Sequence, residues 1–116
     1  MANMRTCCMA LGLALSASVA APASAQMREA KASRVTAVTV SDDGYLYLTL
    51  QETISRRTWG CRDTKLARSA RKLDDAPAQA WLKLALVSYR YRKPLRIWGR
   101  GCTSSAIPVF TKLRLE

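Results

Sequence analysis

The stretch Pro94–Cys102 reads PLRIWGRGC, and it runs from a predicted strand through two glycines into a cysteine. Within it, Leu95–Trp98 alternates aliphatic residues with an arginine and a tryptophan, which is the two-residue period of a strand with one buried face. A shorter, similar sequence, TWGC, occupies Thr58–Cys61. Cys61 and Cys102 thus each follow a Trp-Gly pair, and we expect them to belong to one structural unit.

Residues 1–25 have the composition of a signal peptide. Arg5 precedes the uncharged apolar run Met9–Ala21, and Ala23-Ser24-Ala25 supplies the small residues that a signal peptidase reads, so cleavage is expected before Gln26. The apolar run is shorter than the roughly 20 residues needed to span a bilayer. The sequence therefore predicts an exported protein, periplasmic or secreted, with no integral membrane segment after cleavage.

Cleavage would remove Cys7 and Cys8 and leave Cys61 and Cys102 in an oxidising compartment. A disulfide between the remaining pair is the expected state there, and a domain this small gains from such a bond. A free reactive cysteine is the alternative.

The chain is strongly basic. It holds 19 Lys and Arg against 8 Asp and Glu, a net charge of +11, and only Arg5 of these lies in the signal peptide. Such a charge favours polyanionic neighbours: lipid head groups, acidic glycans, nucleic acid or an acidic protein. The alternative is that the charge serves only solubility.

The segment after the signal peptide begins with a polar leader, residues 26–33, which we expect to fray or to pack loosely. Arg34–Val40 and Tyr45–Gln51 are predicted strands, and the Asp-Gly within Ser41–Gly44 predicts a hairpin turn between them. The inward face of the second strand is expected to carry Leu46, Leu48 and Leu50. Glu52–Thr58 loses this pattern and is expected to be a loop or a frayed strand end.

A third strand is predicted at Thr64–Arg68, with a helical turn over Leu66–Leu73 as the alternative. A helix should then begin near Asp74 and Asp75, which offer N-cap oxygens, and end before Pro94. Its core face is expected to hold Ala78, Trp81, Leu82, Ala85 and Tyr89. Leu84, Leu86 and Val87 widen the apolar surface, so the helix is either heavily packed or contacts a second surface, such as another copy of the chain.

The last two strands follow the helix. Leu95–Trp98 should bury Leu95 and Ile97, and Thr103–Ala106 should form a turn. Ile107–Leu115 is predicted to place Val109, Thr111, Leu113 and Leu115 on one face and Phe110, Lys112 and Arg114 on the other. Pro108 is tolerated near the start of a strand or at a sheet edge.

This element order predicts a mostly β, α+β domain over residues 34–116. Five strands with one helix between the third and the fourth form the order of an OB-fold, a small five-stranded barrel. The alternative is another curled sheet capped by one helix.

Several of these motifs resemble a known family. Gly60-Cys61, the helix reading AWLKLALVSYRYRKPL with its Lys93-Pro94 end, and Gly101-Cys102 are similar to small exported bacterial proteins, the cell-binding B subunits of subtilase-cytotoxin-type toxins. The resemblance covers roughly Arg34–Leu115. It implies an OB-like barrel with one disulfide and a ring of five subunits that recognises glycans, but it assigns no glycan-contacting residue to a position of this chain.

The residue types argue against an enzyme. The chain has no histidine, which excludes imidazole acid–base and histidine-dependent nucleophilic catalysis. The paired carboxylates Asp42-Asp43 and Asp74-Asp75 are explained by a turn and a helix cap. Gly99 and Gly101 lack the spacing of a phosphate-binding loop. We therefore expect no catalytic residue, no metal and no cofactor.

Binding is the better hypothesis. A disulfide would bring together two arginine–tryptophan clusters, because it holds its Cα atoms about 4.4–6.8 Å apart. The candidate ligand-binding residues are Arg56, Arg57, Trp59, Arg62, Arg96, Trp98 and Arg100. Arginine forks beside aromatic rings suit phosphate, carboxylate or sugar ligands. The plainer alternative is that one tryptophan covers the disulfide and the arginines are only solvated.

The sequence thus predicts an exported, non-enzymatic binding module that recognises a glycan or an anionic envelope ligand near the disulfide. The alternative function is a protein-interaction or inhibitor module that docks on an acidic envelope partner. Single-stranded nucleic acid, which many OB-folds bind, is disfavoured by export. Self-association through the helix is the expected route to a homo-oligomer.

Overall fold

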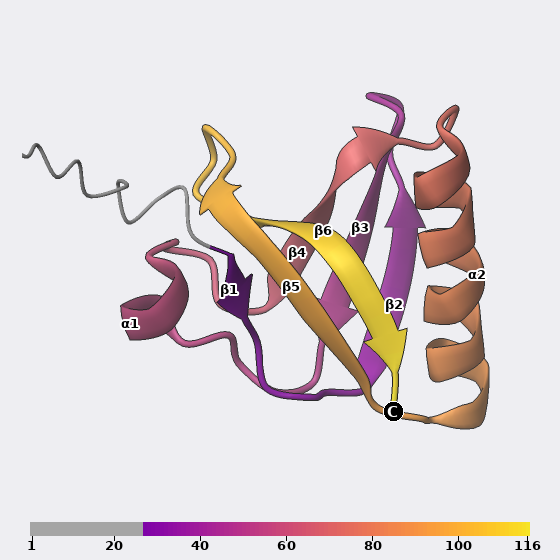
Figure 1. Cartoon of the computed structure of the whole chain (residues 1–116), viewed down its shortest axis with the longest axis horizontal. Coiled ribbons are helices and arrows are strands. Elements are labelled where there is room, and N and C mark those ends of the chain that lie inside the picture. The colour runs from indigo at the N-terminus through magenta and orange to yellow at the C-terminus, as the bar shows by residue number, and fades with distance from the viewer. Residues whose placement is uncertain (1–26) are drawn as a thin grey trace, which may run out of the picture.

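The computed structural model describes residues 27–116, so the predicted signal peptide and its cleavage point lie outside the described part. The elements, in chain order, are β1 Arg28–Glu29, β2 Val35–Val40, β3 Tyr45–Leu50, α1 Arg56–Trp59, β4 Leu66–Lys72, α2 Ala76–Tyr91, β5 Leu95–Cys102 and β6 Pro108–Leu115. The mostly β composition with one long helix between two strands is confirmed (Figure 1).

The strands form one mixed sheet. Its six strands lie in the order β1-β5-β6-β4-β3-β2, and all neighbours are antiparallel except β4 and β6, which run parallel. Between β1 and β2, Ser33 pairs with Leu95 of β5, and Val35 then pairs with Leu50 of β3. The N-terminal segment therefore pairs with β5 near one edge of the sheet and then with β3 near the other edge, which curls the sheet back on itself.

The additional strand β1 corrects one expectation. The leader does not pack loosely, since Ala30 and Ser33 are only 4% and 3% exposed. The Ala30 N–H donates to the Ile97 carbonyl at 2.9 Å, and the Ser33 hydroxyl accepts from the Glu52 N–H at 2.8 Å. The prediction failed because this segment is too short and polar to show a strand period, and its burial depends on β5.

The hairpin is confirmed. β2 and β3 pair across a turn in which Gly44 adopts a φ of 88°, a left-handed value that glycine accepts readily. The inward side chains of β3 are almost fully buried, namely Leu46, Leu48 and Leu50. This face is the centre of the core.

β4 is a strand and not a helical turn. Its two fully buried residues, Ala67 and Ser69, are small, so the inward face carries almost no hydrophobic signal. The Ser69 hydroxyl accepts from the Leu46 N–H at 3.1 Å and donates to the Arg71 carbonyl at 2.7 Å. The predicted loop before β4 contains the short helix α1, which the Ser55 hydroxyl caps by accepting from the Thr58 N–H.

α2 packs against β2, β4 and β6 on one side of the sheet, and Figure 1 shows α1 on the opposite side. Asp75 occupies the N-cap position, yet its carboxylate bonds Arg71 instead of the helix backbone. Ala78, Ala85 and Ser88 face the core, while Tyr89 is 53% exposed. Placing Tyr89 on the core face was therefore wrong. Ser88, the residue before it, faces the core instead.

The predicted faces of β6 are wrong over half of the strand. The pairing passes from Trp98 opposite Lys112 to Gly99 opposite Phe110, so Thr111 is an extra residue in a bulge. The bulge reverses the alternation, and Phe110 is completely buried on the same side of the sheet as Leu113. Its ring lies 5.4 Å from that of Trp81 in an edge-to-face arrangement.

Candidate functional site

The disulfide is confirmed. Cys61 and Cys102 are bonded, with their Cα atoms 5.7 Å apart, and the bond ties the segment after α1 to the end of β5. Cys61 is buried and Cys102 is exposed. The two Trp-Gly sequences therefore do meet at one place, as their similarity indicated.

Trp59 is a structural residue at this junction. Its side chain is buried, and its indole N–H donates to the Gly101 carbonyl at 3.2 Å. Gly60, which follows it, ends α1 with a left-handed φ of 86°. Of the two tryptophans predicted to bind ligand, this one links the end of α1 to β5 beside the disulfide.

Four arginines lie on the segments that the disulfide joins, namely α1 with the loop after it and the end of β5. Arg56, Arg57, Arg62 and Arg100 are all exposed, and we call this set the disulfide corner. The Arg56 Nε donates to the Arg62 carbonyl at 3.2 Å, which draws the helix start and the disulfide loop together. Within residues 27–116, the ion pairs involve Arg71, Arg96 and Arg114, and none involves an arginine of the disulfide corner.

The nearest acidic residue in sequence does not neutralise the disulfide corner by an ion pair. One carboxylate oxygen of Asp63 accepts from the backbone N–H groups of Lys65 and Leu66, each at 2.9 Å. This turn uses one of the two Asp63 oxygens, and a single carboxylate is set against four guanidinium groups. The corner is thus a local excess of positive charge.

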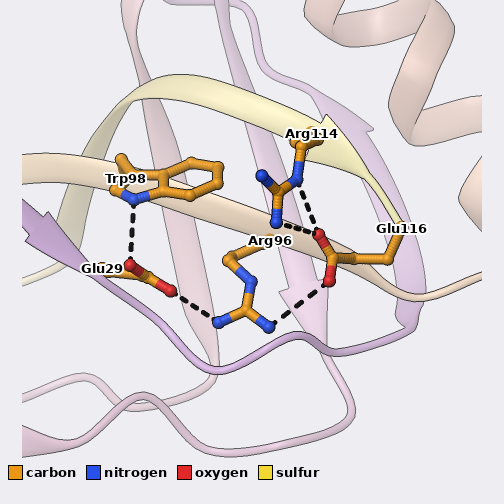
Figure 2. Close-up of polar contacts among 5 residues, drawn as sticks. All are labelled: Glu29, Arg96, Trp98, Arg114 and Glu116. Carbon is orange, nitrogen blue, oxygen red and sulfur yellow. Dashed lines mark hydrogen bonds and ion pairs between the residues drawn. The ribbon is translucent and has the colours of Figure 1, made fainter.

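Arg96 and Trp98 lie on the outer face of β5, opposite Leu95 and Ile97, as the alternation predicted. Figure 2 shows the Arg96 guanidinium held between two carboxylates. Its Nη1 lies 2.5 Å from Glu29 and its Nη2 lies 3.3 Å from Glu116. These bonds, first to Glu29 and then to Glu116, raise the pKa of Arg96 above its usual value.

A second arginine binds the same side-chain carboxylate of Glu116. The Arg114 guanidinium lies 2.7 Å from Glu116, and this contact, followed by the bond from Arg96, holds the pKa of the Glu116 side chain below its usual value. Glu116 therefore stays charged over a wider acidic range than a free glutamate.

Trp98 is engaged in the same network. Its indole N–H donates to Glu29 at 3.2 Å (Figure 2). The Lys112 ammonium lies 4.5 Å and the Arg114 guanidinium 5.2 Å from the centroid of its ring. Both are cation–π contacts, which occupy the ring that was predicted to stack on a ligand.

The predicted site thus divides into two parts. The disulfide corner keeps four exposed arginines, whereas Trp59, Arg96 and Trp98 have partners inside the protein. The partners that sequence reasoning missed are Glu29, Lys112, Arg114 and Glu116. Only the alternation of β6 hinted at Lys112 and Arg114, whereas Glu29 and Glu116 come from the two ends of the described chain.

Among residues 27–116, no three His, Cys, Asp or Glu side chains gather closely enough to hold a metal ion. No helix in the same range is long and apolar enough to cross a membrane. No protein-family model and no curated protein matches this chain. The function must therefore be inferred from the site itself.

Proposed function

We propose that this protein is an exported, non-enzymatic module that binds polyanionic ligands at the disulfide corner. The observation that carries the proposal is the corner itself, where Arg56, Arg57, Arg62 and Arg100 are exposed and form no ion pair with a described carboxylate. Guanidinium groups form paired, charge-assisted hydrogen bonds with sulfate, phosphate and carboxylate groups. An acidic glycan or an anionic envelope polymer presents such groups in series.

The corner is held in place before a ligand arrives. α1 is capped at its start by Ser55, ends at the left-handed Gly60, and is tied to β5 through Trp59 and the disulfide. A fixed backbone lowers the entropy lost on binding. The disulfide also supports export, because such bonds persist in oxidising compartments.

We further propose that the domain is an OB-like barrel to which β1 is added. The support is the strand order, the parallel pairing of β4 with β6, the return of the N-terminal chain to β5, and the helix between β4 and β5. On this basis the similarity to toxin B subunits remains a proposal for the fold, the ligand class and a ring of subunits.

Heparin, a soluble sulfated polysaccharide, tests the function by titration calorimetry at several salt concentrations. The double variant R57A/R100A should bind more weakly and lower the slope of log affinity against log salt by about one to two. The control K83A/K93A removes the same charge from exposed positions on and just after α2. Equal losses in both variants would show that only net charge matters and would refute the proposed site.

A further inference from the structure

A second candidate site lies at the other end of the molecule, between the start of β2 and the last turns of α2. An open groove of about 830 Å³ runs there, with Arg34 and Thr36 on one side and Leu86, Tyr89, Arg90 and Arg92 on the other. Figure 1 places this end of α2 across the sheet from α1. The groove is therefore separate from the disulfide corner.

The groove is positively charged. Arg34, Arg90 and Arg92 are exposed, and no acidic residue lines the groove. None of the three belongs to an ion pair within the described part of the chain. Arg92 also has a left-handed φ of 56° at the end of α2, where glycine is the usual residue. An arginine at this position keeps a third guanidinium at the groove.

The helix side of the groove carries two apolar side chains beside its arginines. Leu86 and Tyr89 are 48% and 53% exposed, and they lie one turn apart on α2. They are turned away from the core, which α2 contacts through Ala85 and Ser88. The groove thus combines an apolar wall with guanidinium groups.

Hydrogen bonds hold the two sides of the groove together. The Val35 N–H donates to the Ser88 hydroxyl at 3.4 Å, and that hydroxyl donates to the Lys93 carbonyl at 2.6 Å. On the strand side, the Gln51 N–H donates to the Arg34 carbonyl at 2.9 Å. Because Ser88 links β2 to the end of α2, the groove is preformed, as small-molecule sites usually are.

We propose that this groove binds an amphipathic anion, a molecule that carries a phosphate, sulfate or carboxylate group beside an apolar or aromatic group. The arginine forks fit the oxyanion, and Leu86 and Tyr89 fit the apolar part. An inorganic anion alone would leave that wall in water. The volume lies within the range of about 300–1,000 Å³ that is typical of small-ligand sites. Two sources have this chemistry, a soluble aromatic phosphate and a lipid head group with its chain.

Fluorescence titration with 1-anilinonaphthalene-8-sulfonate, an aromatic sulfonate, tests the proposal. The folded protein should bind the dye saturably. R34A/R92G and Y89A should each weaken binding about tenfold, since each removes one half of the recognition. R92G places glycine at a left-handed position, and Tyr89 is exposed, so both variants should fold, which circular dichroism melting checks. Phenyl phosphate should displace the dye at concentrations where inorganic phosphate does not.

R57A/R100A is the control, because it removes two arginines of the disulfide corner and should leave dye affinity unchanged. If the protein binds the dye but not heparin, this inference stands and the proposed function is refuted. If it binds heparin but not the dye, the proposed function stands and this inference is refuted. Co-sedimentation with phosphatidylglycerol vesicles, if abolished by R34A/R92G, identifies a lipid as the source; no sedimentation identifies a soluble ligand. Unchanged dye affinity in both groove variants would refute the inference, as would a dimer that buries Leu86 and Tyr89.

Discussion

Replacing Cys61 and Cys102 together by alanine should remove a large part of the stability of the domain. The two residues are 41 apart in sequence. For a loop of that length the chain-entropy relation gives about 13 cal/mol/K, or about 4 kcal/mol at 25 °C. A domain of this size has a free energy of unfolding of about 5–13 kcal/mol, at about 0.05–0.15 kcal/mol per residue. The disulfide therefore contributes at least about a third of the free energy of unfolding, and most of it if the domain is at the low end of this range.

Urea denaturation followed by tryptophan fluorescence measures this loss. Trp59 reports directly on the junction, because it is buried and bonded to the Gly101 carbonyl beside the disulfide. The unmutated protein under reducing conditions should match C61A/C102A to within about 1 kcal/mol, since both open the same loop. A loss below about 1 kcal/mol in the double variant would refute the reasoning, because the closed loop would then not limit the unfolded chain.

Two further predictions concern β5 and β6. Gly99→Ala should destabilise the protein by at least about 1–3 kcal/mol, because its Cβ would stand 2.0 Å from the Val109 carbonyl oxygen. Gly60→Ala has open space at a φ of 86° and should cost only about 1 kcal/mol, and equal urea midpoints would contradict the steric argument. The lowered pKa of Glu116 means that its contribution is full above the usual glutamate pKa and is lost as pH falls through its folded pKa. Between pH 6 and pH 3 the melting temperature of Arg114→Ala should therefore fall less than that of the unmutated protein, and a larger fall would contradict this sign.

The elements that were predicted well are those that local chemistry determines. The hairpin of β2 and β3 has an Asp-Gly turn and three alternating leucines, and each signal acts within a few residues. The end of α2 at Arg92, just before Pro94, is determined equally locally, because proline and the residue before it resist helical geometry. Predicting the disulfide required only the number of cysteines left after cleavage and an assumption about the compartment.

The elements that were missed, or that were predicted only beside an alternative, depend on distant partners. β4 buries alanine and serine, which are acceptable inside only because β3 and β6 lie beside them and Leu46 bonds Ser69. The bulge at Thr111 has no local signal either. It exists because Gly99 lets β6 approach closely, and that approach turns Phe110 into the core. Alternation of apolar and polar residues along β6 alone therefore cannot predict the bulge.

The same physical reason explains why the candidate site changed. Alternation along β5 correctly placed Arg96 and Trp98 on the outer face. It could not show that Glu29 and Glu116 would reach Arg96 from positions 67 and 20 residues away. A guanidinium that already has two carboxylates gains little from a third anion, since a new ligand must replace bonds of equal kind. Anion recognition should therefore shift to arginines whose neighbours supply no carboxylate. The arginines of both proposed sites are exposed and form no ion pair within residues 27–116, those of the disulfide corner on α1, the following loop and β5, and those of the groove at the start of β2 and the end of α2.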